Sequence, residues 1–583
     1  MTGRITRVEL VNYLWYSDDN NCSWKLGYAP SISSQASSAS QSSTSTSLDD
    51  EKLTIYELSD TDITNLINEN INSIKIDKRS KSSLVSRTNT HAVDPSHFQN
   101  LYDLCFMNNL HEAPLVDVLN RRFLDSDIYT SCGDVLISVN PYKFIQGLYD
   151  NPMRFLSFEK KVYGSRALVS TLMCVPHVYQ IANNTLRDLM NSVIIDDVEN
   201  IQLKKVNQSI LISGESGAGK TEASKQVMNF LVLANDEVLE RKAASSIAGG
   251  QSFRSGSQIK DAILESNIIF ESFGNAKTVR NDNSSRFGKY IKLVYDEDNT
   301  LVSAFSETFL LEASRLVVAG KDERNYHIFY QLVRGLPLMN SQLSNTLQLT
   351  IPEDYTILNI GECTTIKSAD DDVSEFNHLI KALTILGFEP LEVDALCTIL
   401  AVILHLGNVQ CYAGEDESQT CIISSKSMST SQISELLGVN EDVFVSAILT
   451  HKMIIARRSV QVKILTSVDA NNNIAALIKW IYSCIFKWIV LKINEANSHE
   501  GDISSLYKYI GILDIFGFET LNVNSFEQLC INFANERLQK LFNEEVFDLE
   551  QQYYATNGLM WTEIVYKGIS YLIIVTLILI LTL

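Results

Sequence analysis

The sequence predicts an α/β fold, and three observations support this prediction. Residues 209–221 read SILISGESGAGKT, an apolar strand that runs into a glycine turn. Residues 221–233, TEASKQVMNFLVL, place Ala223, Val227, Phe230 and Leu231 on one face of a helix. Residues 509–519, YIGILDIFGFE, form a second apolar strand that ends in an acid. Buried strands combined with amphipathic helices are typical of a sheet with helices on its faces.

The composition is that of a large, acidic globular protein. The chain has 583 residues, of which 45% are hydrophobic, so it can bury a large core. Its net charge of −21 argues against nucleic acid or an anionic membrane surface as the main partner, because both bind basic faces. The ten cysteines are scattered without a CxxC pair. This pattern fits reduced thiols in the cytoplasm better than a disulfide framework or a zinc site.

The N-terminal part is interrupted by polar sequence. Residues 31–47 read SISSQASSASQSSTSTS, which has almost nothing to bury and predicts a flexible linker. Residues 78–90, KRSKSSLVSRTNT, predict a basic exposed loop. We therefore assign residues 31–90 to a Ser-rich and basic linker that follows a separate piece at residues 1–30. No comparable interruption follows in residues 91–566, which predicts one large body.

The glycine turn matches the phosphate-loop pattern GxxxxGK[ST] in full. Glycine lets backbone amides approach phosphate oxygens, and the amides together with the helix N-terminus form an anion cradle. Lys220 would reach the β- and γ-phosphates of a nucleotide, and the Thr221 hydroxyl would bind Mg²⁺. The alternative is a plain glycine turn in an α/β core, which would not need the Lys-Thr pair. The expected nucleotide-binding residues of the loop are Gly214, Glu215, Ser216, Gly217, Ala218, Gly219, Lys220 and Thr221.

Two further segments would complete a nucleotide site. Asp514 ends its strand as the acid of a Walker-B-type strand does. Gly517 follows and could offer its amide to a γ-phosphate, and Glu519 stands two residues later. Residues 273–290 gather amides, hydroxyls and a guanidinium: Asn281, Asn283, Ser284, Ser285 and Arg286. Such a segment suits closure over a phosphate and its metal ion.

Taken together, these segments resemble the myosin motor domain. GESGAGKTEA is similar to the family's phosphate loop, NDNSSRFG to its first switch and DIFGFE to its second switch. LLEASR (310–315), ERNYHIFYQL (323–332), ILHLGN (403–408) and a relay-helix phrase (524–547) follow in the family's order. The resemblance covers residues 91–566. It implies a P-loop NTPase fold with a mixed, mostly parallel central sheet flanked by helices, and a largely helical upper domain. Residues 1–30 would then be a remnant of the SH3-like N-terminal subdomain.

The resemblance implies an ATP-dependent, actin-based motor, which is an actin-activated Mg-ATPase with F-actin as partner. Thr221 and Ser285 would be the protein ligands of Mg²⁺, and Asp514 would hold the metal's waters from the second shell. Asn281 would contact phosphate oxygens, while Ser284 and the Gly517 amide would frame the γ-phosphate and the attacking water. Arg286 and Glu519 would form a salt bridge that closes the site, although a plain structural pair is the alternative. The relay helix, for which Asn524 and Glu527 predict a capping box, would carry the closure onward.

Residues 140–149, NPYKFIQGLY, resemble the family's purine-binding loop. The resemblance implies that Asn140, Pro141, Lys143 and Tyr149 hold the adenine base of ATP. Many members place the tyrosine eight residues after the asparagine, whereas here it follows nine residues after it. Ordinary aromatic packing is therefore the alternative role for Tyr149.

Ser459 is the regulatory candidate. The family places an acidic or phosphorylatable residue sixteen positions before a phrase that here reads AALIK, and Ser459 occupies this position. Arg457 and Arg458 precede it and resemble a basophilic kinase site. A phosphate there would add about 1.5–2 negative charges near the actin interface. An unmodified exposed serine is the alternative.

The C-terminal segment, residues 567–583, is apolar. Its last sixteen residues carry no charge, whereas a membrane-spanning helix needs roughly 20 apolar residues. A tail anchor, a buried core segment and foreign sequence all stay open. Since the converter and the lever are expected beyond residue 566, the sequence predicts an incomplete motor domain, in which light chains or calmodulin would need a lever absent from the chain. The alternative function is a non-motile product, either a nucleotide-binding module or a tail-anchored membrane protein. We expect location at the actin cytoskeleton, with membrane association only through this segment.

Overall fold

A computed structural model describes residues 13–17, 24–28, 52–58, 82–86, 90–156, 175–191, 207–245, 256–366, 369–413, 421–455, 459–498, 508–519 and 526–562. The chain divides into two compact units, Met1–Asn183 and Asn184–Leu583.

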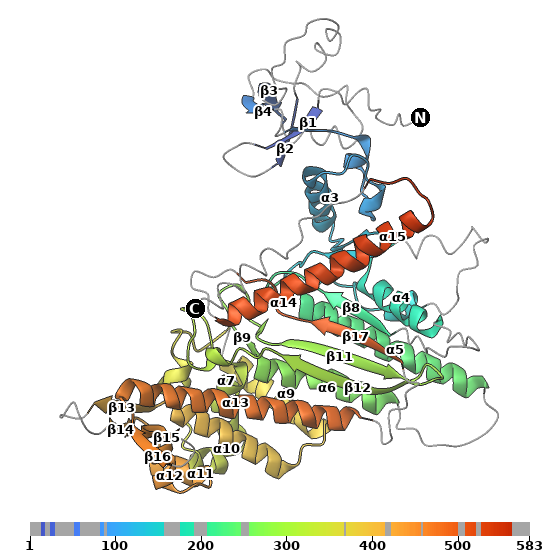
Figure 1. Cartoon of the computed structure of the whole chain (residues 1–583). Helices are drawn as coiled ribbons and strands as arrows, with labels where there is room; N and C mark the ends of the chain where they lie inside the picture. Colours follow the sequence, from blue (N-terminus) through green and yellow to red (C-terminus); the bar gives the residue numbers. More distant parts are fainter. Residues whose placement is uncertain are drawn as a thin grey trace, which may run out of the picture. The chain divides into compact units, whose positions relative to one another are not determined.

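The first unit begins with an antiparallel sheet of five described strands in the order β4-β3-β2-β1-β5 (Figure 1). The strands are β1 (Tyr13–Ser17), β2 (Trp24–Tyr28), β3 (Lys52–Glu57), β4 (Ser82–Ser86) and β5 (Thr90–Ala92). Aromatic side chains suit such a half-buried pleated surface, and Tyr13 and Trp15 of β1 pack with Leu26 of β2. The rest of the unit contains η4 (Pro95–Phe98), η5 (Leu104–Phe106), α3 (Glu112–Leu124), the hairpin β6 (Tyr129–Cys132) and β7 (Val135–Ser138), η6 (Pro152–Phe155) and the start of α4 (Val178–Asn191).

This sheet corrects the linker assignment of residues 31–90. β3 and β4 lie inside that range and pair with each other, and β3 also pairs with β2. The segment KLTIYE alternates apolar and polar side chains, and Ile55 is fully buried, so these two stretches are sheet rather than linker. The serine run at residues 31–47 lies outside the described residues.

The second unit is built on a mixed sheet with the described strand order β12-β11-β17-β8. The strands are β8 (Gln208–Ile212), β11 (Gly288–Tyr295), β12 (Leu301–Phe309) and β17 (Lys508–Asp514). β17 runs parallel to β8, but β11 runs antiparallel to both β12 and β17. The prediction of a mostly parallel sheet is therefore wrong for the described strands. The reason is local: β11 and β12 are joined by a short turn, and a tight turn joins only antiparallel strands.

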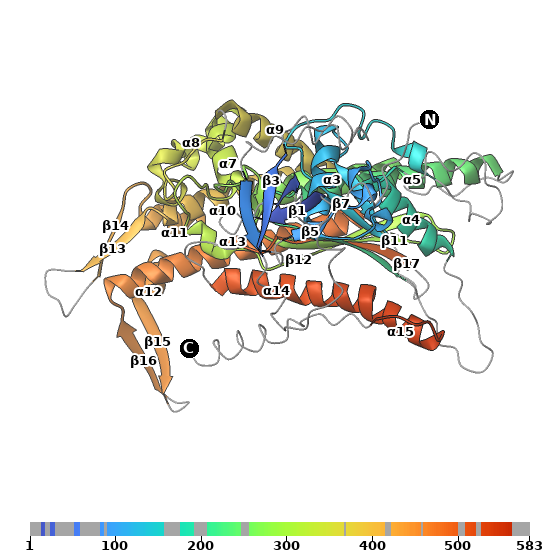
Figure 2. The same cartoon turned by 90° about the horizontal axis from the view of Figure 1, so that it is seen from above.

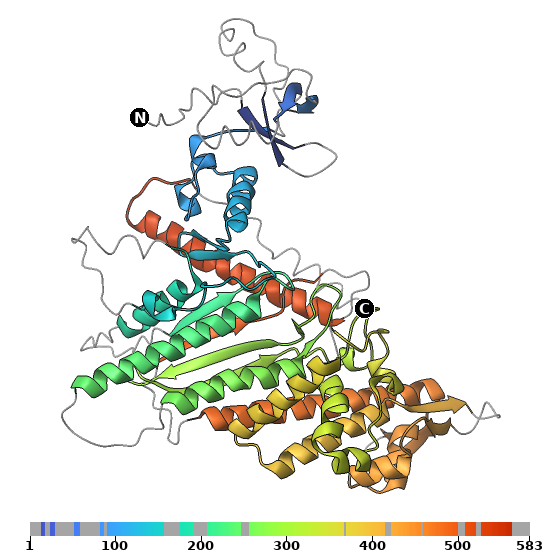
Figure 3. The same ribbon diagram turned by 180° about the vertical axis from the view of Figure 1, so that it is seen from behind.

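Helices cover both faces of this sheet. Helices α5 (Lys220–Ser245) and α6 (Gly256–Gly274) lie on one face (Figure 3). Helix α14 (Phe526–Asn543) lies on the opposite face from α5 (Figure 2) and continues through the π-helical turn η10 (Glu544–Asp548) into α15 (Leu549–Thr556). Short strands β9 (Asn275–Ala276) and β10 (Ser284–Ser285) pair beside the sheet.

A helical part follows the sheet strands in the second unit. It contains η7 (Ala313–Leu316), α7 (His327–Met339), α8 (Ser341–Thr346), η8 (Pro352–Asp354), η9 (Thr356–Leu358), α9 (Ala369–Ile385), α10 (Pro390–Leu406), α11 (Thr430–Leu436), α12 (Glu441–Leu449) and α13 (Ser467–Asn497). Two hairpins extend it, β13 (Val409–Ala413) with β14 (Cys421–Ser425), and β15 (Thr450–Ile455) with β16 (Ser459–Ile464). The second hairpin projects away from the helices (Figure 2). The largely helical domain expected from the resemblance therefore has its counterpart here.

Helix α13 is the central core helix of this part. It is long and apolar enough to cross a membrane by length and composition, and it is the one such helix among the described residues. Its buried residues Ile474, Ile478, Tyr482 and Phe486 recur every four positions and join the main hydrophobic cluster. The Tyr482 hydroxyl donates to the Phe273 carbonyl over 2.6 Å. These contacts are those of a core helix. The apolar segment 567–583 lies outside the described residues.

Candidate functional site

The sheet brings two of the predicted loops together. β8 and β17 are parallel neighbours, and Ile212 at the end of β8 lies opposite Asp514 at the end of β17. The glycine loop and residues 515–519 therefore both start at the carboxyl end of neighbouring strands, on the same side of the sheet. In open α/β sheets this carboxyl edge is where ligands bind.

The glycine loop has the conformation that its sequence predicts. Gly217 and Gly219 have φ values of 82° and 92°, a region that side chains with a Cβ rarely adopt. Helix α5 starts at Lys220, whose ammonium donates to the carbonyls of Gly214 and Glu215, each over 2.8 Å. Burial lowers the pKa of Lys220, against the opposing effect of Asp514, Glu519 and Glu215. The Lys220 ammonium therefore lies against the loop carbonyls and close to three carboxylates, which favour its charged form.

Gly517 meets the glycine loop backbone to backbone. A Cβ placed on Gly517 would lie 2.3 Å from the Gly214 carbonyl oxygen and 2.7 Å from the Glu215 carbonyl carbon. Both distances are too short for any real contact. The segment after β17 can therefore approach the glycine loop this closely only because residue 517 has no side chain.

A buried ion pair joins the two predicted switches. The Arg286 guanidinium donates to both carboxylate oxygens of Glu519, over 2.8 and 3.3 Å. Both side chains are less than one-tenth exposed. Arg286 also donates to the Ser284 hydroxyl, which lies 3.3 Å from the Ser216 hydroxyl of the glycine loop. Ser284, Arg286, Gly517, Glu519 and the loop are thus gathered in one place.

Arg286 has a second acidic partner, Glu312, which no sequence pattern marked as a site residue. Glu312 accepts from Arg286 Nε over 2.6 Å and from Arg315 Nε over 2.7 Å. Burial alone would raise the pKa of Glu312, but the two arginines outweigh it and lower this pKa to about 2. The pKa of Arg286 is raised, because Glu312 and Glu519 outweigh its burial. Glu312 and Arg315 stand in the phrase LLEASR, which carried the resemblance but no assigned role.

Side-chain amides of helix α14 hold residues 516–519, and no sequence pattern marked these amides as site residues. Asn532 accepts from the Glu519 amide and donates to the Glu519 carbonyl, each over 2.8 Å. Asn535 donates to the Phe516 carbonyl over 3.0 Å. Gln528 reaches Glu519 over 3.4 Å and Glu312 over 3.5 Å. The expected capping residue of the helix, Asn524, lies outside the described residues.

The groups expected at a metal ion are hydroxyls and one carboxylate. Thr221 is the second residue of α5, and the Ser285 hydroxyl donates to the Phe287 carbonyl over 2.9 Å. Asp514 is buried, its Oδ2 has no hydrogen-bond partner in the described part of the chain, and Lys289 Nζ lies 3.9 Å from it. Among the described residues no three His, Cys, Asp or Glu side chains gather to hold a metal. This donor set fits Mg²⁺, which keeps waters and shares phosphate oxygens, rather than a metal that needs a protein cage.

Asn281 lies in the first switch segment and orders it locally. Its amide group donates to the Asn283 carbonyl over 3.2 Å, and its Oδ1 accepts from the Asn283 amide over 3.1 Å. The Asn283 side chain in turn bonds Asn275 and Glu271. Asn281 therefore sits in a self-supporting polar loop next to Ser284.

The expected purine-binding residues belong to the first unit, so the fold does not relate them to the glycine loop. Pro141 follows Asn140, whose side chain accepts from the Tyr142 amide over 3.0 Å, and Lys143 is exposed. The Tyr149 hydroxyl lies 2.8 Å from the Tyr129 hydroxyl, and its ring contacts those of His177 and Tyr179. These contacts are the aromatic packing named above as the alternative role for Tyr149.

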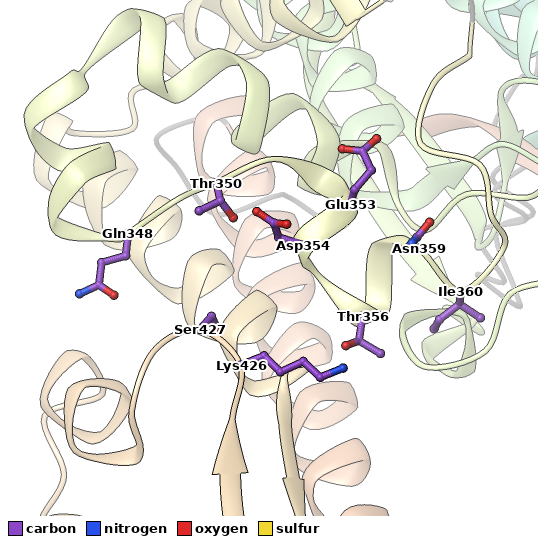
Figure 4. A pocket seen from close by; sticks show the side chains of 9 residues that line it. All are labelled: Gln348, Thr350, Glu353, Asp354, Thr356, Asn359, Ile360, Lys426 and Ser427. Carbon is purple, nitrogen blue, oxygen red and sulfur yellow. The ribbon is translucent and has the colours of Figure 1, made fainter.

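Two further features lie elsewhere in the second unit. Ser459 begins β16 opposite Ile455, while Arg457 and Arg458 lie outside the described residues. A surface cavity of about 750 Å³ lies between the η8–η9 region and the segment after β14 (Figure 4). Its lining is Gln348, Thr350, Glu353, Asp354, Thr356, Asn359, Ile360, Lys426 and Ser427, none of which the sequence marks as a site residue.

The chain is similar to known myosins over most of its length. The profile of the family described as myosin head (motor domain) matches residues 101–579. Myosin-2A of Naumovozyma castellii is 37% identical over 80% of this chain and 28% of its own length. Myosin-J heavy chain of Dictyostelium discoideum is 35% identical over 81% of this chain and 20% of its own length. Unconventional myosin-Vb of Rattus norvegicus is 37% identical over 79% of this chain and 22% of its own length.

The family match differs in extent from the resemblance seen in the sequence. The chain spans between a fifth and a third of the length of these relatives. The profile continues beyond residue 566, where we expected the family pattern to stop. A match over more than two thirds of the chain, together with the phosphate loop and both switches in one site, leads to one conclusion: the chain belongs to the myosin head (motor domain) family and has its P-loop NTPase fold.

Proposed function

We propose that the chain is the head of an ATP-dependent, actin-based motor and that it hydrolyses Mg-ATP at the site between the glycine loop and the two switches. The observation that carries the proposal is the Arg286–Glu519 pair, because it joins two loops that lie 233 residues apart in the sequence. Such a latch assembles only when both loops close. A glycine loop that merely bound a nucleotide would not need it.

The residues of the site fit the requirements of phosphoryl transfer, which depends on positioning and charge neutralisation. Lys220 and the loop amides would bind the β- and γ-phosphates. Ser284 and the Gly517 amide would orient the γ-phosphate and the attacking water. The Arg286–Glu519 pair would keep bulk water out and hold the lytic water in place.

Mg²⁺ would be held by Thr221 and Ser285, with Asp514 orienting its waters, and when bound it would neutralise phosphate charge. Asn281 would add a contact to the phosphates. Asn140, Pro141, Lys143 and Tyr149 would hold the adenine, with packing in the aromatic cluster as the alternative role for Tyr149. We also propose F-actin as partner, Ser459 as a phosphorylation site near the actin interface, and location at the cytoplasmic actin cytoskeleton.

The test compares Glu519→Gln with wild type. Loss of the carboxylate charge should lower Mg-ATPase by about 10²–10³-fold while ATP binding is kept, as for other lost transition-state contacts. Glu307→Gln is the matched control, because Glu307 forms a partly exposed ion pair with Lys292 on the same sheet. The control should hydrolyse ATP like wild type.

Two outcomes would contradict the proposal. Equal hydrolysis by Glu519→Gln and wild type would show that the latch does not serve the reaction. Binding of ATP by wild type without turnover, with or without F-actin, would favour the alternative of a nucleotide-binding module.

A further inference from the structure

Two cysteines of the first unit lie against each other, outside the candidate functional site. Cys105 belongs to η5 and Cys132 is the last residue of β6. They stand on two segments that are joined by a backbone bridge between Asp103 and Ser131, and both residues are exposed to solvent. The two cysteines are therefore close to each other in the fold and accessible.

The backbone around the pair keeps the two thiols together. The Ser131 amide donates to the Tyr102 carbonyl over 2.9 Å, and Asp103 and Ser131 form a parallel bridge. The Asp103 carboxylate accepts from the amide of Cys105 over 3.0 Å and from the amide of Gly133 over 3.2 Å. One aspartate thus fixes the backbone beside both cysteines.

Gly133 confirms how closely the two segments approach. A Cβ placed on Gly133 would lie 3.7 Å from Cys105 Sγ, which is van der Waals contact. Sulfur from η5 therefore packs directly on the turn that follows Cys132. No rearrangement of the backbone is needed to bring the two segments into contact.

We propose that Cys105 and Cys132 form a dithiol site that small oxidised thiols, such as glutathione disulfide, convert reversibly to an intramolecular disulfide. The Cys132 thiolate attacks one sulfur of glutathione disulfide, its S–S bond breaks, and one glutathione thiolate leaves. Cys105 then loses its proton and attacks the Cys132 sulfur of the mixed disulfide, which releases the second glutathione. The two cysteines lose two electrons and two protons, and the two glutathione molecules take them up.

The surroundings set the order of these steps. Desolvation of the thiol, with the Asp103 carboxylate next to it, raises the pKa of Cys105 to about 11. Cys105 is therefore mostly protonated near neutral pH and reacts slowly with an external disulfide. Once Cys132 carries glutathione, the second attack is intramolecular, because Cys105 Sγ packs on the turn that follows Cys132. Cys132 is thus the entry point and Cys105 the resolving thiol.

The bond would also fasten a defined part of the fold. The loop that it closes contains all of helix α3, and β6 leads through its hairpin to Asn140. Closing a loop removes freedom from the opened chain more than from the folded one. Amides of α3 and β6 should therefore exchange with solvent more slowly after oxidation.

The experiment uses the full chain, treated with glutathione disulfide and digested without reduction for peptide mass mapping. We expect a linked Cys105–Cys132 peptide pair that dithiothreitol releases. Cys105→Ser should instead accumulate glutathione on Cys132. Cys484→Ser, which removes an exposed cysteine on α13, is the matched control and should leave the linkage unchanged.

Two results would overturn the proposal. One is glutathione on both cysteines of the native chain without linkage between them. The other is linkage in equal yield after unfolding in urea, since the folded geometry would then have no part in it. Phenylarsine oxide, which needs two adjacent thiols, gives an independent readout: retained binding at this site in Cys132→Ser would also contradict the proposal.

Discussion

At the scale of single residues, Gly517 gives the sharpest prediction. In Gly517→Ala the new methyl group would meet the Gly214 carbonyl oxygen at 2.3 Å, so one of the two loops must move. We expect Mg-ATPase to fall at least about 10²-fold, as when one preorganised donor is lost. Steady-state hydrolysis and single-turnover rates measure this.

Gly438→Ala is the matched control for that substitution. Its Cβ meets open space, but its φ of +67° is unfavourable for alanine. It should cost about 1–2 kcal/mol of stability and leave hydrolysis unchanged. Equal hydrolysis by the two variants would show that the approach of Gly517 to the phosphate loop does not matter for turnover.

Residues whose role follows from a short sequence pattern could be predicted from the sequence. Residues whose role depends on contacts with distant parts of the chain could not. Arg286, Gly517 and Glu519 stand in compact phrases that the structure brings together. Gln528 hydrogen-bonds Glu312, which lies 216 residues away. No local spacing could reveal such a contact, since it depends on how α14 and η7 pack around the switches.

At the scale of elements, helix α14 should be coupled to the second switch through Asn532. Asn532→Ala removes two hydrogen bonds to the Glu519 backbone, which we expect to cost about 1–3 kcal/mol. The change in hydrogen exchange of α14 on addition of nucleotide should be smaller in Asn532→Ala than in wild type, while ATP binding is kept. Gln539→Ala, on the same helix but bonded only to Asn543, is the control. A normal nucleotide response in Asn532→Ala would refute the coupling.

The start of α4 should be sensitive to acid through His177. Its Nδ1 accepts from the Tyr179 amide, its Nε2 donates to the Leu148 carbonyl, and the Phe155 ring stacks on it at 4.6 Å. Burial above all, with Arg154 nearby, lowers the pKa of His177 to about 4. Protonation of His177 is less favourable in the folded state than in the unfolded state. The contribution of His177 to the free energy of unfolding is therefore fully present above about pH 6.5 and decreases as the pH falls toward 4.

We expect the loss at this site to reach about 3 kcal/mol near pH 4. Hydrogen-exchange protection factors of α4, measured from pH 7 to pH 4, report it. His177→Gln should flatten the pH dependence, whereas His378→Gln, at an exposed position on α9, should not. Unchanged pH dependence in His177→Gln would assign the effect to another group.

Elements with strong local patterns were predictable, and elements that depend on distant pairing were not. The strand, glycine turn and helix around Lys220 form as their sequence predicts. β3 and β4 were hidden in polar surroundings, because each forms by pairing with other strands rather than from a long apolar run of its own. The antiparallel course of β11 was missed because strand direction follows from the turn before β12, not from the apolar pattern.

At the scale of the whole molecule, binding at the glycine loop should stabilise the second unit. A ligand that binds only the folded state adds about 2.7 kcal/mol at a concentration 100 times its Kd. Mg²⁺ with a slowly hydrolysed ATP analogue should therefore raise the thermal midpoint of wild type. Lys220→Ala should show little or no rise, and an equal rise in both would place the nucleotide elsewhere.

The contact between Gly517 and the glycine loop limits how the rate of the proposed hydrolysis can be changed by substitution. Backbone atoms lie on both sides of the gap between Gly517 and the glycine loop. Substitution of side chains therefore cannot change the width of this gap in small steps. Gradual changes of turnover would instead come from residues behind the two walls of this gap, such as Asn532 and Gln528, which hydrogen-bond Glu519 and so affect how often the gap is closed. An engineer who wants a slower or faster head should therefore vary those supports and leave the wall itself alone.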